Sequence, residues 1–469
     1  MITIEIPDTY EPERRYILSV IFGEFLGLDT QIQVSDRQDT RILINDDSRE
    51  LVIADGLFAT PPKQWLQPAS LPKQPLLIWN FANTGLSATT VSPDIPVIYG
   101  NEPNRSDFLQ YTENKIYLGL DIFGSAFFML TRYEEVVKPD RDQHDRFPAT
   151  ASLAYQENFL DRPIINEYLE ILWACLTKLW PRLQRKPRQF QTYVSHDVDE
   201  PFRYAFMDSL QIARRCAGDI LKRRAPLQAM ENATRWFLVK AGKAEADPCN
   251  TFDLIMDISE KHNLKSAFYF ITDRSAGILD GVYSINHSLI RQLLRKIHQH
   301  GHEIGLHTSY NTYQSPEQTK KELKILKQVC AEEGIEQDTW GGRQHYLRWE
   351  TPTTFQNWAN AGLDYDTTLS FADVTGFRCG VCYEFTTFNL KTRQPLKLKE
   401  RPLVLMECTV LDQIYMNLGT EGGAALQVMK KYKHCCQLFN GDFTLLWHNS
   451  SLMQRREIEL YQKMVSNCD

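Results

Sequence analysis

QTYVSHDVD at residues 191–199 is a strand-like run that ends in polar side chains. Its β-branched and aromatic residues favour a strand, and its end supplies Asp197 and Asp199 two positions apart. Outward from it, helix-like runs alternate with further strand-like runs, which are KSAFYFIT at 265–272, HEIGLHT at 302–308, PLVLMECT at 402–409 and DFTLLWHNS at 442–450. This alternation predicts an α/β fold with a parallel sheet wrapped by helices, either an open doubly wound sheet or a barrel.

Polar side chains follow the ends of these predicted strands. In a parallel sheet or barrel, the carboxyl ends of the strands meet at one edge, where the chemistry of such folds collects. The residues expected there are Asp197, Asp199, His307, Arg343, His345, Glu407 and His448. An aspartate at a strand end is by itself more often a turn former or a helix cap. The combination of acids, imidazoles and an arginine nevertheless predicts the site of a metal-assisted hydrolase.

Four segments of the chain together resemble the polysaccharide deacetylases, the NodB-homology or carbohydrate esterase family 4 enzymes. The segments that match the family's motifs in turn are SHDVD at 195–199, HEIGLHTSYN at 302–311, GGRQHYLRW at 341–349 and LLWHN at 445–449. The resemblance covers about residues 190–450 and implies a distorted (β/α) barrel of the NodB type. Residues 343–382 further resemble a bacterial subgroup from surface-polysaccharide gene clusters, whose members carry an extra N-terminal domain.

The resemblance also implies roles for individual residues. Asp197 corresponds to the general base, and Asp199 and His307 correspond to ligands of a divalent metal, which we expect to be zinc. We expect Arg343 to pair with Asp197 and keep it ionised. His448 would protonate the leaving amine, and either Glu407 or Asp412 would hold its imidazole in the required tautomer.

The second motif departs from the family at Asn311, where the usual residue is a second metal-binding histidine. A carboxamide oxygen is a weaker ligand than imidazole for a zinc-like ion. Three arrangements follow from this difference. Asn311 coordinates through its carbonyl, His345 supplies the missing imidazole, or the metal is weakly held or absent.

The function implied is metal-dependent removal of N-acetyl groups from amino sugars of a bacterial glycan or its precursor. Two alternatives stay open. One is hydrolysis of a different carbon–nitrogen bond, such as that of a sugar formamide. The other is a catalytically silent glycan-binding or scaffold protein on the same fold, which the asparagine in the second motif would permit.

A change in the pattern of strand-like and helix-like runs along the chain predicts two domains. Residues 1–187 hold short strand-like runs, two amphipathic helices and a longer closing helix, which predicts a mixed α/β accessory domain that narrows the cleft of the catalytic domain. Residues 188–469 form the predicted catalytic domain, with 207–250 as a helical insertion. A single Cys379-x-x-Cys382 pair needs further ligands to make a zinc site, so we expect it to be structural.

The composition of the chain disfavours some classes of binding partner and some cellular locations. The 469 residues carry a net charge of −7, which disfavours nucleic acid and polyanionic glycans as partners. No apolar run is long enough to span a membrane, and the N-terminus does not have the pattern of a secretory signal. The ten cysteines suit a reducing compartment, so we expect a cytoplasmic protein. Its expected partners are an N-acetylated sugar or oligosaccharide and, at a membrane face, a lipid-linked glycan.

Overall fold

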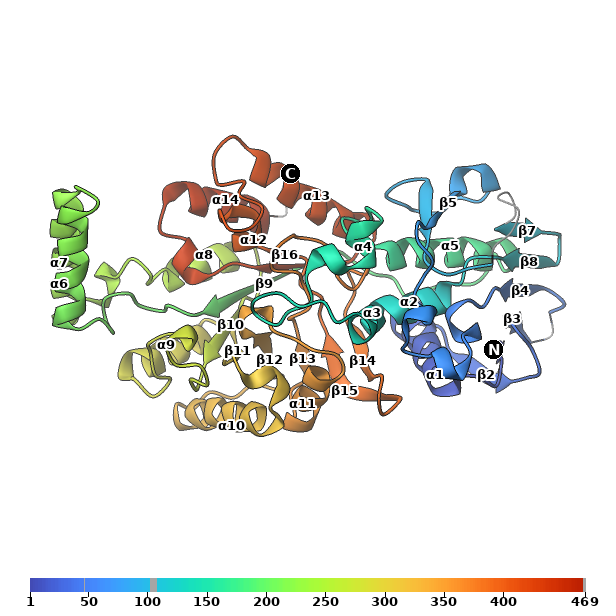
Figure 1. Ribbon diagram of the computed structural model, residues 1–469, viewed down its shortest axis with the longest axis horizontal. Coiled ribbons are helices and arrows are strands. Elements are labelled where there is room, and N and C mark those ends of the chain that lie inside the picture. Colours follow the sequence, from blue (N-terminus) through green and yellow to red (C-terminus); the bar gives the residue numbers. More distant parts are fainter. Residues whose placement is uncertain (46, 102–107, 467–469) are drawn as a thin grey trace.

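Two sheets, each covered by helices, form the framework of the molecule (Figure 1). The structure is a computed structural model that describes residues 1–45, 47–101 and 108–466. The strands of the smaller sheet all precede residue 119, and those of the larger sheet all follow residue 190. Within the described chain, no helix combines the length and the apolar character that crossing a bilayer requires.

The larger sheet is parallel except at one edge. Its strands lie in the order β14 (Phe385–Asn389), β15 (Gln394–Glu400), β13 (Tyr365–Asp366), β12 (Gly341–Gln344), β11 (Glu303–Thr308), β10 (Ala267–Ile271), β9 (Gln191–Val198), β17 (Asp442–Leu446) and β16 (Leu405–Met406). Among these described strands, only β14 runs antiparallel to its neighbour. The sheet is a half-barrel with β14 and β16 as its edges, which confirms the predicted α/β barrel-like fold in an open form.

Six helices of the described chain cover the sheet, and all but the last of them connect one strand to the next. They are α8 (Phe252–Lys261), α9 (Ser288–Gln299), α10 (Pro316–Glu332), α11 (Thr353–Ala361), α13 (Ala424–Leu438) and α14 (Arg455–Val465). The helix α9 is representative, because its buried residues Ile290, Leu293, Leu294 and Ile297 recur at helical spacing on one face. Since each crossover returns the chain to the same end of the sheet, the carboxyl ends of the strands meet at one edge.

The smaller sheet is mixed. Its order is β2 (Thr30–Val34), β1 (Ile2–Ile6), β3 (Thr40–Ile44), β4 (Glu50–Ile53), β8 (Lys115–Leu118) and β7 (Leu109–Tyr111). The hairpin of β5 (Leu77–Asn80) and β6 (Asp94–Val97) lies beside it. The helices of this part are α1 (Glu11–Leu18), which continues as a π-helix over Ser19–Leu26, then α2 (Ile122–Leu130), α3 (Tyr133–Val137), α4 (Leu153–Gln156) and α5 (Ile164–Leu179).

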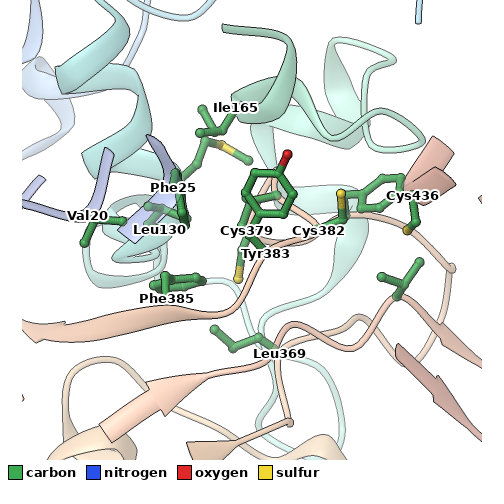
Figure 2. Close-up of a cluster of buried hydrophobic side chains, with 14 of the residues drawn as sticks. Val20, Phe25, Leu130, Ile165, Leu369, Cys379, Cys382, Tyr383, Phe385 and Cys436 are labelled. Atoms are coloured by element: carbon green, nitrogen blue, oxygen red, sulfur yellow. The ribbon is translucent and has the colours of Figure 1, made fainter. Parts of the chain in front are cut away.

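The two sheets share one continuous apolar core. Figure 2 shows side chains from both parts of the chain gathered in it: Val20, Phe25, Leu130 and Ile165 from the N-terminal part, and Leu369, Cys379, Cys382, Tyr383, Phe385 and Cys436 from the C-terminal part. The thiol of Cys379 is fully buried, and burial raises its pKa above the ordinary value. Neither Cys379 nor Cys382 belongs to a group of metal-ligating side chains in the described residues. This pair therefore packs the junction between the two parts.

A buried ion pair also crosses the junction. The Nε and Nη2 atoms of Arg378 donate to Glu135 at 2.9 and 2.6 Å, and both side chains are almost completely buried. Burial alone would raise the pKa of Glu135, but Arg378 and Arg132 outweigh it and lower that pKa. Removing the N-terminal part would leave Arg378 as an uncompensated charge within exposed apolar surface.

We therefore expect residues 188–469 alone not to fold into a stable monomer. Loss of one partner of a buried ion pair costs about 3–5 kcal/mol, which is a large part of the 5–15 kcal/mol that stabilises a typical domain. In the full chain, Glu135→Gln should lower the free energy of unfolding by about this amount in denaturant titration. The matched control is Asp161→Asn, which removes the exposed junction pair with Lys431 and should cost less than about 1 kcal/mol. A stable, fully active 188–469 fragment would contradict this account of the junction.

Candidate functional site

The predicted polar side chains converge at the carboxyl edge of the half-barrel. They surround a cavity of about 390 Å³ whose lining includes Asp197, Asp199, His307, His345 and His448. These residues follow or end four strands, β9, β11, β12 and β17, that lie within a run of five neighbours in the sheet. Residues separated by 251 positions in sequence thus share one cavity because parallel strands end at one edge.

Three side chains form the centre of the site. The Oδ1 atom of Asp199 lies 3.2 Å from Nε2 of His307 and 3.6 Å from Nε2 of His345. These three residues could hold a metal ion, since their ligand atoms all lie within 4.8 Å of one another. Burial alone would raise the pKa of Asp199, but His345 and His307 outweigh it, so that pKa is well below the ordinary value.

Hydrogen bonds to the other ring nitrogens orient both histidines. The Nδ1 atom of His307 donates to the carbonyl oxygen of Arg343 at 2.9 Å, and Nδ1 of His345 lies 3.2 Å from Oδ1 of Asp280. In the neutral form of each ring, Nε2 therefore carries the lone pair and faces Asp199, whose buried Oδ1 atom has no hydrogen-bond partner in the described residues. Two imidazole nitrogens and a carboxylate oxygen grouped in this way fit a bound cation.

Asp197 lies beside this cluster and is held by Arg343. The Nη1 atom of Arg343 donates to Oδ1 of Asp197 at 2.7 Å, while Oδ2 of Asp197 lies 3.7 Å from Nε2 of His307. Arg343 is fully buried, and Nη2 also donates to Ser195. Burial would raise the pKa of Asp197, but the guanidinium outweighs it and keeps that pKa below the ordinary value.

His448 approaches the cluster from the opposite side. Its Nε2 atom lies 3.7 Å from Oδ2 of Asp199, and its Nδ1 atom lies 2.7 Å from Oε1 of Glu407, the first residue of α12 (Glu407–Leu411). Burial alone would lower the pKa of His448, but Glu407 and then Cys408 outweigh it and raise that pKa well above the ordinary value. The closest acid to Nδ1 is thus Glu407, and Asp412 lines the cavity instead.

Asn311 is not brought into this cluster. Its amide nitrogen donates to the carbonyl oxygen of Ser275 at 3.1 Å, and its Oδ1 atom accepts from Nη1 of Arg348 at 3.2 Å. The residue is exposed and is not among those lining the cavity. With its carboxamide engaged in this way, Asn311 is left out of the ligand set that we propose below, and His345 takes its place.

Sequence reasoning missed two contributors to the site. Asp280 lies in the loop after β10, is completely buried and accepts from the backbone nitrogens of Tyr310 and Ala276 at 2.6 and 2.7 Å. Arg146 comes from the N-terminal part, lines the cavity and donates to the carbonyl oxygen of Tyr346 at 2.9 Å. Both lie in loops with no recognisable pattern, so no signal in the sequence would have selected them.

The aromatic side chains near the motifs are placed differently from one another. Tyr346 lines the cavity, and its backbone takes the left-handed conformation with φ of 59°. Tyr310 instead packs under the guanidinium of Arg348. Trp349 and Trp447 are buried in the core and so are unavailable for stacking on a sugar. Of these four, Tyr346 is the one positioned for contact with a substrate.

We expect Asp280→Asn to weaken metal binding by about 10- to 100-fold, because carboxylate partners of ligating histidines typically contribute this much. Asparagine retains a carbonyl acceptor but loses the charge that fixes the orientation of His345. Affinity would be measured by competition with a chromophoric chelator. Asp273→Asn is the control, since Asp273 lies in the same loop but pairs with Lys321 and Gln318, and it should leave the affinity unchanged. Wild-type affinity in Asp280→Asn would show that His345 does not depend on this carboxylate.

Comparison with known proteins gives one family match for each part of the chain. Residues 2–181 match a family of unknown function (DUF7033), and residues 245–360 match the polysaccharide deacetylase family. The second match contains Asp280, His307, Arg343 and His345. No curated protein sequence matches the chain significantly.

Several solved structures resemble the chain at low identity. A structure named as a polysaccharide deacetylase from Mycobacterium smegmatis is 14% identical, with a TM-score of 0.38, over 60% of this chain and 84% of that one. Puue allantoinase is 12% identical, with a TM-score of 0.34, over 59% and 83% of the two chains. Agd3, a carbohydrate deacetylase, is 9% identical, with a TM-score of 0.35, over 99% and 83%.

The family matches agree with the architecture described above. The deacetylase match covers the strands β10, β11 and β12, whose carboxyl ends lead to Asp280, His307 and His345, and the four sequence motifs surround the same cavity. The N-terminal match covers the six-stranded sheet and its helices. Residues 245–360 thus match the polysaccharide deacetylase family, and residues 2–181, on their N-terminal side, match the DUF7033 family.

Proposed function

We propose that this carbohydrate deacetylase is a metal-dependent hydrolase that removes N-acetyl groups from amino sugars of a bacterial glycan or its precursor. One observation carries the proposal. Asp197, Asp199, His307, His345 and His448 face one cavity, and the oxygen of Asp199 that meets two imidazoles has no hydrogen-bond partner among the described residues. A site for water activation and a site for leaving-group protonation are thereby adjacent.

In this proposal Asp199, His307 and His345 hold the metal. One carboxylate and two imidazoles suit zinc, which typically takes three protein ligands and keeps one position open in catalytic sites. When bound, such an ion lowers the pKa of a coordinated water and polarises the acetyl carbonyl. Asn311 is not a ligand here, because its carbonyl oxygen accepts from Arg348.

Asp197 is the proposed general base. Its carboxylate is ionised because Arg343 donates to it at 2.7 Å, and its second oxygen is free to accept the proton of the attacking water. Arg343 fixes the carboxylate in place, so the base and the water can meet without rearrangement. The pKa of Asp197 lies below the ordinary value, which keeps the base active in mildly acidic solution.

His448 is the proposed general acid. Glu407 accepts from Nδ1 of His448 and stabilises its protonated form, so the Nε2 proton faces the cavity. After water adds to the acetyl carbon, this proton passes to the sugar nitrogen as the carbon–nitrogen bond breaks. The products are acetate and the free amine.

We expect His448→Ala to lower kcat by about 10²- to 10⁴-fold, which is the usual contribution of a general acid. Metal content should be unchanged, because His448 is not among the three proposed ligands. The loss should be smaller with a substrate whose leaving group needs no protonation, such as an acetate ester of a nitrophenol. An equal loss on the amide and the activated ester would contradict an acid role for His448.

Product analysis with N-acetylglucosamine oligomers tests the proposed function. The proposal predicts acetate release that requires bound metal. Formate release from an N-formylated sugar, without acetate release from the acetylated one, would replace it with a sugar deformylase. Glycan binding without any turnover would replace it with a catalytically silent binding protein on this fold.

We also propose a partner and a cellular location for this enzyme. The acidic chain disfavours nucleic acid as a partner, and a lipid-linked glycan remains the proposed source of the acetylated sugar. The cysteines in the described residues are all free thiols, which suits the proposed cytoplasmic location. Cell fractionation with an antibody to the chain would test that location.

A further inference from the structure

A helical hairpin stands apart from the body of the molecule (Figure 1). It consists of α6 (Ser209–Leu221) and α7 (Pro226–Lys240), which follow β9 in the chain. The two helices pack on each other around a small core of their own that contains Tyr204, Ile212 and Val239. Buried hydrogen bonds of 2.6 and 2.7 Å join Asn232 to Tyr204 and to Asp219 and fix the pair as a unit.

The outer surface of this hairpin is unusually apolar for a protruding element. At its tip, Leu221 and Leu227 are 78% and 79% exposed, and Met230 and Phe237 on α7 are 67% and 66% exposed. Exposed apolar residues recur at helical spacing on both helices, on the sides that face away from the hairpin core. They are Leu210, Ile220 and Leu221 on α6, and Leu227, Met230, Phe237 and Leu238 on α7. Such side chains cost free energy in water unless another surface covers them.

The same hairpin is strongly basic although the chain is acidic. Residues 209–243 contain eight lysines and arginines and two acids, a net charge of +6, whereas the whole chain carries −7. Two of the basic residues are neutralised within the hairpin, as Arg223 pairs with Asp219 and Arg235 with Glu231. The other six form no ion pair with any residue that the structure describes: Arg214, Arg215, Lys222, Arg224, Lys240 and Lys243.

The root of the hairpin is bound to the edge of the candidate active site. The side-chain nitrogen of Asn449, the neighbour of His448, donates to the carbonyl oxygens of Glu200 and Cys249 at 3.0 and 2.8 Å. These two residues flank the hairpin on either side in the chain. One hydrogen-bonding side chain therefore joins both ends of the insertion to the loop that carries His448.

Exposed aliphatic side chains also line the cavity at this edge. Ile278 and Ile414 are 83% and 79% exposed, and Leu279 lies beside them in the lining. They come from the loop after β10 and the segment after α12, both at the carboxyl edge of the sheet. Exposed apolar side chains are thus found both at the mouth of the candidate active site and on the hairpin whose root adjoins it.

We propose that the α6–α7 hairpin docks the enzyme on an anionic lipid bilayer, with the cavity mouth facing the membrane. Basic residues interleaved with exposed apolar residues on helices match the chemistry of an anionic interface, which attracts the charges and accepts the apolar side chains. A symmetric contact between the hairpins of two copies fits less well, since the two basic hairpins would repel each other. The purpose of docking rests on the proposed function, because it brings the cavity to an acetylated sugar attached to a lipid.

Vesicle cosedimentation of the full-length protein tests the docking. Wild-type protein should bind vesicles of phosphatidylcholine mixed with phosphatidylglycerol, bind more weakly as salt is raised, and not bind pure phosphatidylcholine. Each lysine or arginine near such a surface contributes about a fivefold gain in partitioning, so Lys222→Gln/Arg224→Gln should bind about 25-fold more weakly. Leu221→Ser/Leu227→Ser should lose at least about tenfold.

Matched controls separate the hairpin from general charge and hydrophobicity. Lys320→Gln/Lys324→Gln removes two exposed charges on α10, and Leu77→Ser/Ile78→Ser removes two exposed apolar residues on β5; both should bind like wild type. The proposal is overturned if wild-type protein does not bind the anionic vesicles, or if hairpin and control variants lose binding equally. It is also overturned if the hairpin variants instead dissociate an oligomer in sedimentation velocity without changing vesicle binding.

Acetate release from a soluble N-acetylglucosamine oligomer keeps the two proposals distinguishable. The hairpin variants should retain this activity, because none of the changed residues lines the cavity. Vesicle binding without acetate release by the wild type would refute the proposed function and leave the docking intact. Acetate release without vesicle binding would refute the docking and leave the proposed function intact.

Discussion

Turnover by the Asp197→Asn variant is expected to fall by about 10⁴-fold, while its metal content stays at the wild-type level. Asparagine has almost the same shape as aspartate but cannot accept the proton of the attacking water, and a general base contributes up to about this factor. The metal should remain because Asp199, His307 and His345 are all intact. Acetate release and elemental analysis on the same preparation would measure both quantities.

Folding must be monitored in this variant because Arg343 loses its charged partner. The guanidinium is fully buried, and removal of a buried counter-charge costs about 3–5 kcal/mol. Thermal unfolding should therefore report a less stable but folded protein. The assignment of Asp197 as base fails if the variant is folded and loses its metal, or if it retains wild-type turnover.

The Asp199→Asn variant is expected to lose both metal and activity. Asp199 supplies the only carboxylate of the three-residue group, and the group's centre is its Oδ1 atom, at 3.2 and 3.6 Å from the two imidazoles. A neutral amide in its place removes the charge that binds a divalent ion and presents an NH₂ group to one side. Wild-type metal content would be the contradicting result.

Asp412→Asn is a suitable control for the loss of metal. Asp412 lines the same cavity but is not a member of the three-residue group. Its variant should bind metal like wild type in the chelator competition. If Asp197→Asn loses metal while Asp199→Asn retains it, the base and the ligand have been assigned the wrong way round.

The sequence predicted the convergence of the site but not its detailed composition. The carboxyl ends of strands in a parallel sheet meet at one edge whatever conformation the following loops take. Asp199, His307 and His448 could therefore be placed together from the pattern alone. The placement of Asn311 and His345 depends on the loops after β11 and β12. There, Arg348 binds the carbonyl of Asn311, and Tyr346 takes a left-handed backbone conformation. Such tertiary contacts leave no periodic signal in the sequence.

In the N-terminal part, too, the sequence pattern predicts the regular elements but not the tertiary contacts of the loops. Its strands and the helix α5 follow from apolar runs, but the segment around Arg146 is polar and has no period, so its sequence predicts only a loop. The structure places this loop against Tyr346 at the cavity. The shared core with Cys379 and Cys382 was likewise invisible, since a CxxC pair looks the same whether it binds a metal or packs a junction.

The most direct measurement is acetate release from an N-acetylglucosamine oligomer while zinc is titrated into chelator-treated wild-type protein. The account predicts no activity without metal, and a rate that rises in proportion to bound metal and stops rising at one ion per chain. It also predicts that Asn311→Ala saturates with metal like wild type, whereas His345→Ala does not. Acetate release by the metal-free protein, or metal saturation without acetate release, would contradict the account.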